Sequence, residues 1–262
     1  MKTFLVSLPR TRSSVVCELL RGYNIHKHGL KEIEGQSEFF LEWGRNMELC
    51  DRKVDKYHTT ELYPIAHKDG IKMHYVYPWV LNDTKSRNLY KLDLLKAEKE
   101  KGHEYYVKGT LNIAESCEEI LDFYKDRKII ITERDDIESM YMSFFFAWES
   151  KMFHARKQNI DLYKRKLDEG VTIPHQIILD YIPFVKQMDK IKTYLKDNDF
   201  DYSVITYEQL ENTDIISEVL GTEEWEIYAD FDSLPIKIDK DYKKLIKNYD
   251  EVKQILIDNG VL

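Results

Sequence analysis

The sequence predicts an α/β fold: a three-layer sandwich in which helices cover both faces of a central parallel sheet. Short apolar runs rich in β-branched residues alternate with stretches of helical periodicity along the 262 residues. Continuous apolar runs are typical of strands buried on both faces, as in parallel sheets. No repeat, low-complexity linker or proline- and glycine-rich boundary divides the chain. We therefore expect one domain over residues 1–262.

Four runs are predicted to be strands because each is short, apolar and followed by polar residues. They are Thr3–Leu8, His103–Val107, Lys128–Thr132 and Tyr202–Thr206. Seven segments have the apolar spacing of helices, namely residues 14–21, 38–48, 88–101, 114–124, 137–150, 177–196 and 239–259. Residues 50–87 follow neither pattern clearly, so we expect an insertion of helix and loop there.

Charge and cysteine content exclude several classes of protein. Acidic side chains outnumber basic ones by 47 to 39, which gives a net charge of -8, and no long basic run is present. A surface that coats nucleic acid is therefore not expected, and an anion site must be local. The three cysteines have no CxxC spacing, which indicates neither a disulfide framework nor a zinc site. We expect a cytoplasmic protein without a signal peptide or membrane span, because the first apolar run is short.

The stretch Ser7–Ser14, SLPRTRSS, follows the first predicted strand and leads into the first predicted helix. Ligands of open parallel sheets bind beyond the carboxyl ends of the strands, and helix N-termini attract anions. The hydroxyls of Thr11, Ser13 and Ser14 and the guanidinium groups of Arg10 and Arg12 would add donors and charge. A phosphate-like ligand is predicted, although a serine that only caps the helix explains part of the pattern.

A second basic element follows the predicted strand Lys128–Thr132. Arg134 comes directly after it, and Ser139 and Ser143 lie four residues apart on one face of the next predicted helix. An arginine followed by a helical hydroxyl is a second candidate phosphate site. Pairing of Arg134 with a neighbouring aspartate, and serines bonded to their own helix, is the structural alternative. Two anion sites at one sheet edge indicate a ligand with two phosphate-type groups.

Together these segments resemble the sulfotransferases that use 3'-phosphoadenosine 5'-phosphosulfate (PAPS), which have a P-loop NTPase-like fold. Residues 9–14, PRTRSS, are similar to their 5'-phosphosulfate loop, and Arg134 with a later serine is similar to their 3'-phosphate motif. Residues 205–210, ITYEQL, resemble a segment whose tyrosine, here Tyr207, lies near the nucleotide. Lys108 resembles a lysine that follows an earlier strand. The matches occur in the family's order and span most of the chain; the closest branch is that of the bacterial trehalose sulfotransferases.

The resemblance implies a general base as well. Residues 35–40, GQSEFF, are similar to a segment of the trehalose sulfotransferases whose glutamate is the base, which would be Glu38. The same residues are also explained by a helix in which Ser37 is the N-cap and Glu38 is a favourable acid in the first turn. Histidine is the base in other branches, so His26 and His28 are further candidates.

Three departures from the family pattern matter. Arg12 stands where the phosphosulfate loop usually has glycine. The family's serine usually lies about eight residues after the arginine, where this chain has Met142, so Ser139 and Ser143 both remain candidates. The Arg-Lys-Gly segment that closes the nucleotide site in animal cytosolic members is not found.

The implied activity is transfer of the sulfuryl group of PAPS to a hydroxyl acceptor by in-line displacement, without a metal. Arg10 and Lys108 would stabilise the leaving group, and Glu38 would take the acceptor's proton. The acceptor is a small molecule or carbohydrate of unspecified identity, and the oligomeric state is open. The alternatives are a P-loop kinase that uses Mg-ATP, although no Walker A sequence is present, and a non-catalytic nucleotide-binding protein.

Overall fold

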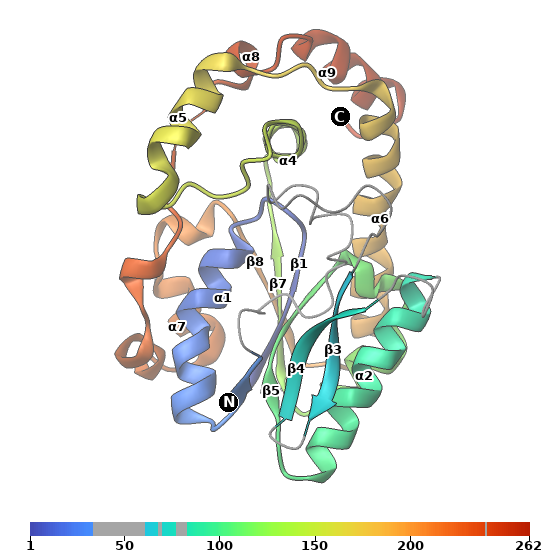
Figure 1. Ribbon diagram of the computed structural model, residues 1–262, viewed down its shortest axis with the longest axis vertical. Helices are drawn as coiled ribbons and strands as arrows, with labels where there is room; N and C mark the ends of the chain where they lie inside the picture. Colours follow the sequence, from blue (N-terminus) through green and yellow to red (C-terminus); the bar gives the residue numbers. More distant parts are fainter. Residues whose placement is uncertain (34–60, 68–69, 77–82, 239) are drawn as a thin grey trace.

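Four parallel strands form the central sheet of the structure, a computed structural model that describes residues 1–33, 61–67, 70–76, 83–238 and 240–262 (Figure 1). Their order is β6-β1-β7-β8. The strands are β6 (Lys108–Thr110), β1 (Thr3–Ser7), β7 (Lys128–Glu133) and β8 (Tyr202–Thr206). The predicted α/β fold with a parallel sheet is confirmed.

The strand register aligns the carboxyl ends of three neighbouring strands. Ser7 of β1 lies opposite Thr132 of β7, and Glu133 of β7 lies opposite Thr206 of β8. All pairings in this sheet are parallel, so the residues that follow these positions emerge at one edge. The polar segments after β1, β7 and β8 are therefore neighbours although they are far apart in sequence.

Helices cover both faces of the sheet and bury alternate residues of its strands. On one face, α1 (Ser13–Gly22) and α7 (Asp214–Leu220) pack on Leu5 and Ile130. On the other, Phe4 and Ile131 contact a larger apolar cluster. Its helices are α2 (Thr84–Glu100), α3 (Cys117–Phe123), α4 (Ile137–Ser150), α6 (His175–Asp197) and α9 (Tyr249–Asp258). Figure 1 shows the resulting three layers, with α1 and α7 on one side and α2 and α6 on the other.

Beyond the carboxyl edge of the sheet, α5, α8 and α9 form an arch around α4 (Figure 1). The first two span Ile160–Glu169 and Tyr242–Leu245. Between α4 and α5 the chain is irregular apart from a 3-10 turn at Lys157–Asn159. No helix in the described ranges is both long and apolar enough to cross a membrane.

Several elements differ from the sequence-based expectation. The expected strand His103–Val107 contains only the short strand β5 (Tyr105–Tyr106), which pairs with β2 (Lys31–Glu32) outside the main sheet. The strand of the main sheet, β6, begins after the expected range, at Lys108. Part of the expected insertion of helix and loop is an antiparallel hairpin, β3 (Glu61–His67) with β4 (Gly70–Val76). The expected helix 38–48 lies outside the described residues.

The expected C-terminal helix 239–259 is broken between α8 and α9. There Ile246 leaves the helix to pair with Val171, and Lys247 donates its N–H to the Val171 carbonyl at 2.8 Å. Tertiary pairing thus overrides a continuous helical pattern, and Ile246 is buried at the break.

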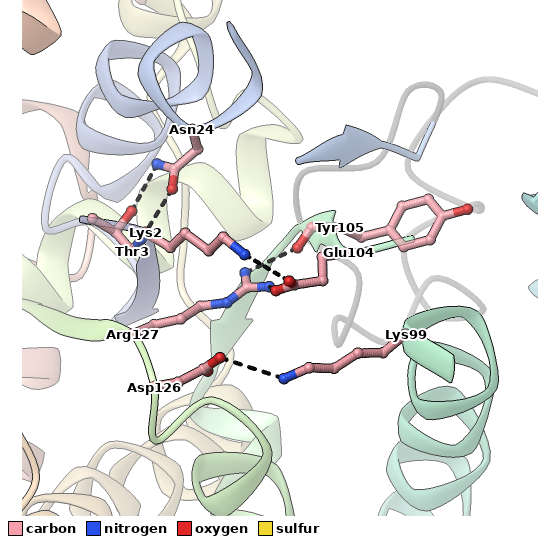
Figure 2. A network of polar contacts seen from close by, with 8 residues as sticks. All are labelled: Lys2, Thr3, Asn24, Lys99, Glu104, Tyr105, Asp126 and Arg127. Atoms are coloured by element: carbon pink, nitrogen blue, oxygen red, sulfur yellow. Dashed lines mark hydrogen bonds and ion pairs between the residues drawn. The ribbon is translucent and has the colours of Figure 1, made fainter. Parts of the chain in front are cut away.

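A network of charges fixes the amino-terminal edge of the sheet, opposite to the arch (Figure 2). The Glu104 carboxylate accepts hydrogen bonds from Lys2 Nζ at 2.6 Å and Arg127 Nη2 at 2.9 Å. Arg127 also donates to the Tyr105 carbonyl at 3.0 Å, and its side chain is only 2% exposed. Burial alone would raise the pKa of Glu104, but Lys2 and Arg127 together hold this pKa below its usual value. The network joins the residues before β1 and β7 to β5.

Replacing Arg127 by methionine should lower the free energy of unfolding by about 3 kcal/mol, because Glu104 and the Tyr105 carbonyl would lose a buried partner. Urea denaturation followed by circular dichroism measures this change. Lys99→Met is the matched control, since its pair with Asp126, also drawn in Figure 2, is exposed. The control should cost less than about 1 kcal/mol. Equal effects of the two substitutions would contradict a structural role for the network.

Candidate functional site

A cavity of about 350 Å³ lies at the carboxyl ends of β1, β7 and β8. Its walls come from the segments after these strands, from α4 and α5, and from the irregular chain before α8. The lining residues are Arg10, Arg12, Ser13, Ser14, Val15, Arg134, Ser139, Ser143, Phe153, His154, Ala155, Tyr163, Tyr207, Pro235, Ile236, Lys237, Ile238, Lys240 and Tyr242. The structure therefore brings the two predicted basic elements to one cavity.

The charge of this cavity is opposite to that of the chain. Five of the nineteen lining residues are arginine or lysine, and none of those described is aspartate or glutamate. The whole protein carries a net charge of -8. A low-dielectric concavity lined by one sign of charge concentrates its field on a ligand of the opposite sign. The arrangement is suited to an anion.

The loop between β1 and α1 has an unusual backbone. Arg10 and Arg12 have φ angles of 66° and 57°, in the left-handed region that glycine adopts most easily. Arg12 is the N-cap of α1 and provides no side-chain cap. The first N–H groups of a helix lack partners within it, so those of Ser13 and Ser14 are available to a ligand. The arginine at the position where the resemblance expects glycine thus keeps a glycine-like conformation.

Hydrogen bonds from Arg10 connect this loop to α4 and the chain that follows it. Its Nε donates to Ser143 Oγ at 3.0 Å, and its Nη1 donates to the Phe153 carbonyl at 2.6 Å. Ser143 is 3% exposed and also lines the cavity. Ser143 was grouped with Arg134 in the sequence, but in this structure its hydroxyl contacts Arg10.

The Thr11 side chain does not line the cavity, contrary to the expectation that its hydroxyl binds the ligand. This hydroxyl donates to the Leu8 carbonyl at 2.7 Å and lies 2.7 Å from Thr132 Oγ1. Both threonines are fully buried. Thr11 therefore joins the loop after β1 to the end of β7, while Ser13 and Ser14 line the cavity.

Tyr207 packs against two cavity arginines. The guanidinium carbon of Arg134 lies 4.2 Å from the centre of the Tyr207 ring, and that of Arg12 lies 5.5 Å from it. Arg12 Nη1 also donates to the Leu210 carbonyl at 2.8 Å. Such cation–π contacts favour both cations where carboxylates are few. The predicted YEQL segment thus supports the arginines of both basic elements.

Glu208 fixes the segment that carries Arg134. Its carboxylate accepts hydrogen bonds from the N–H groups of Asp135 at 3.0 Å and Asp136 at 3.4 Å. Arg134 Nε lies 3.8 Å from Glu208 Oε1 and has no hydrogen-bond partner among the described residues, although this atom is buried. The structural alternative is that Arg134 pairs with a neighbouring aspartate. In the structure Asp136 instead caps α4 by accepting the Ser139 N–H. Hydrogen-bonding capacity of Arg134 is therefore left over for a ligand.

Of the predicted catalytic residues other than Arg10, Lys108 does not line the cavity. Lys108 begins β6 rather than following a strand end, is 1% exposed, and donates to Ser13 Oγ at 3.4 Å. Glu38 lies outside the described residues. His26 and His28 follow α1 at the amino-terminal edge, where His28 Nε2 lies 2.9 Å from the Met1 amino group, so the cavity does not include them.

Two polar cavity residues, His154 and Lys240, have no signal in the sequence. His154 follows α4 in an irregular segment, and its Nε2 lies 3.4 Å from Ser14 Oγ. Lys240 precedes α8, in a stretch that was expected to be helical. Neither residue follows a strand or stands in a motif, so only tertiary packing reveals them.

Burial shifts the titration of Lys240 strongly. Burial in the cavity wall, with further repulsion from Arg10 and Arg134, lowers the pKa of Lys240 from 10.5 to about 7. The cation is disfavoured both by desolvation and by like charge. At neutral pH the empty cavity therefore holds a mixture of neutral amine and ammonium at this position.

Comparisons with known proteins do not assign the chain to a family. No model of a protein family matches it, and no curated protein matches it significantly.

Substitution of Lys240 by methionine should stabilise the fold, and more at pH 6.5 than at pH 10.5. Between these values the unfolded chain binds a proton at Lys240 that the folded chain gives up, so this group destabilises the native state increasingly as the pH falls toward 7. Thermal unfolding of both proteins at each pH measures the difference. A melting-temperature gain that did not depend on pH would contradict the depressed pKa. Lys243→Met, on the exposed side of α8, is the control.

Proposed function

We propose that the protein is a sulfotransferase that moves the sulfuryl group of PAPS to a hydroxyl acceptor. The observation that carries the proposal is the cavity in which Arg10 and Arg134, from two neighbouring strand ends, meet with no described carboxylate in the lining. A ligand with negative charge at two places fits this arrangement better than a single small anion. The sequence resemblance supports the same assignment.

In the proposed complex, each end of the nucleotide has its own donors. The N–H groups at the start of α1, the hydroxyls of Ser13 and Ser14, and Arg10 would hold the 5'-phosphosulfate. Arg134 and Ser139 would hold the 3'-phosphate. Ser143 accepts from Arg10, so its hydroxyl hydrogen could be donated to an anion at either place. Tyr207 would support one cation of each group, Arg12 and Arg134, through its ring.

The chemistry is an in-line displacement at sulfur. The acceptor oxygen forms a bond to sulfur while the bond from sulfur to the bridging phosphate oxygen breaks, which leaves 3',5'-ADP. Charge that develops on the bridging oxygen would be stabilised by Arg10 and the helix N-terminus, with Lys108 acting through Ser13. The proton of the acceptor goes to a base, for which Glu38 is proposed and His154 is the second candidate.

A kinase that uses Mg-ATP is the alternative function. Magnesium is usually bound through one or two carboxylates together with the substrate phosphates. Two acids close to Arg134 already have partners, since Asp136 caps α4 and Glu208 accepts backbone N–H groups. This observation favours the sulfotransferase. A non-catalytic nucleotide-binding protein would bind 3',5'-ADP but transfer nothing.

Arg134→Ala should weaken binding of 3',5'-ADP by about 10- to 100-fold while leaving binding of 5'-AMP nearly unchanged, because Arg134 is proposed to contact only the 3'-phosphate. Isothermal titration calorimetry without magnesium measures both ligands. Arg165→Ala removes an exposed arginine of α5 and should change neither affinity. Preference of the wild-type protein for Mg-ATP over 3',5'-ADP would refute the proposal in favour of the kinase.

Glu38→Gln should reduce sulfuryl transfer by about 100-fold or more with unchanged affinity for 3',5'-ADP, since only proton removal is lost. The rate is measured as release of 3',5'-ADP from PAPS with sugars, small alcohols and phenols as acceptors. His154→Gln is the comparison. Loss of transfer in that variant but not in Glu38→Gln would move the base to His154, and binding without transfer by the wild type to any acceptor would favour the non-catalytic reading.

A further inference from the structure

Lys240 occupies an aromatic enclosure built by three helices. Its Nζ lies 5.7 Å from the ring centre of Phe146 in α4, 5.3 Å from that of Tyr163 in α5 and 5.9 Å from that of Tyr242 in α8. Tyr163 and Tyr242 line the cavity together with Lys240. Rings from three helices therefore lie close to the amine at the cavity wall.

No negative charge balances Lys240 among the described lining residues. Arg10 from the loop after β1 and Arg134 from the loop after β7 both repel it. The other charged or titratable groups of the cavity are Arg12, His154, Lys237, Tyr163, Tyr207 and Tyr242. Burial raises the pKa of Tyr163 and of Tyr242, so these two phenols remain neutral near pH 8. Within the described part of the chain nothing in the lining supplies this counter-charge, and a bound anion would supply it.

Aromatic faces attract a cation by only about 0.5–2 kcal/mol, so the three rings lessen the repulsion from the arginines without cancelling it. An anion in the same cavity changes the balance, because it attracts the ammonium form and offsets the charge of Arg10 and Arg134. Binding of the anion and protonation of the amine are then linked, and each favours the other.

We propose that a tetrahedral dianion entering this cavity draws a proton from solvent onto Lys240, which then becomes an additional cationic ligand of the bound anion. The proton moves from water or buffer to Nζ, and no other bond is made or broken. The inference goes beyond the proposed function, since it requires only an anion in the cavity and not PAPS, a nucleotide or any transfer reaction.

The linkage has a definite sign. Well below pH 7 Lys240 is already protonated without a ligand, so affinity for the anion is greatest and constant with respect to this group. Above that pH each binding event must include proton uptake. The dissociation constant should therefore rise with pH, by up to about tenfold per unit, until the pKa of the bound form is reached.

Proton uptake on binding of inorganic sulfate is the test, because sulfate does not titrate in this range. Calorimetric titrations at pH 8 and constant ionic strength, in two buffers of different ionisation enthalpy, count the protons. We expect about 0.9 of a proton per sulfate, the change for an amine whose pKa rises from about 7 to its ordinary value near 10.4.

Two substitutions at Lys240 and one at His154 assign the proton. Lys240→Met should bind sulfate more weakly with no uptake, and Lys240→Arg should bind it with no uptake because its charge is permanent. His154→Gln should still take up the proton. Circular dichroism checks that each variant is folded.

Sulfate binding without proton uptake, undiminished uptake in either Lys240 variant, or loss of uptake in His154→Gln would overturn the inference. Failure of the wild-type protein to bind sulfate at any pH would overturn it as well. If 3',5'-ADP binds no more tightly than 5'-AMP while uptake at Lys240 persists, the proposed function fails and this inference stands. If instead 3',5'-ADP binds more tightly than 5'-AMP but sulfate binds without proton uptake at Lys240, this inference fails and the proposed function stands.

Discussion

The parallel pairing of β1 with β7 and of β7 with β8 is the constraint on which the candidate site depends. Because these strands run in one direction and end in register, the chain must leave the sheet three times at the same edge. Arg10, Arg134 and Tyr207 each come within a few residues of such an exit. Their meeting in one cavity is a result of strand order, and no local motif would produce it alone.

The cations at the two edges of the sheet have different kinds of partner. At the amino-terminal edge, Arg127 and Lys2 share the carboxylate of Glu104, so both of these cations have a partner of opposite sign. At the carboxyl-terminal edge, the arginines are held mostly by neutral groups, namely the carbonyls of Phe153 and Leu210 and the ring of Tyr207. Neutral acceptors fix a guanidinium without removing its net charge, which leaves that charge for a ligand.

The parallel sheet and the basic segments could be predicted from sequence because both depend on local patterns. The strands β1, β7 and β8 are continuous apolar runs, and α4 begins and ends where its pattern predicts. The placement of Arg10 and Arg134 followed from the rule for strand ends. Prediction failed where the deciding contact is distant in sequence.

Thr11 and the last helix illustrate that failure. The sequence predicts the Thr11 hydroxyl to be a ligand donor because its neighbours in the loop also carry hydroxyls. Its partner is Thr132, which lies close to Thr11 only because β1 pairs with β7. Likewise the break at Ile246 depends on Val171, and the position of Lys240 depends on rings from three separate helices. Such contacts carry no periodic signal that a single sequence displays.

The buried pair of hydroxyls formed by Thr11 and Thr132 has a mechanical consequence. It ties the loop that carries Arg10 to β7, the strand that directly precedes Arg134, through one short link inside the core. The distance between the segments that carry Arg10 and Arg134 is then set by the packing of the core and not by the bound ligand. A cavity whose basic groups are held at a fixed distance would select a ligand by the distance between its two charged ends, before any reaction begins.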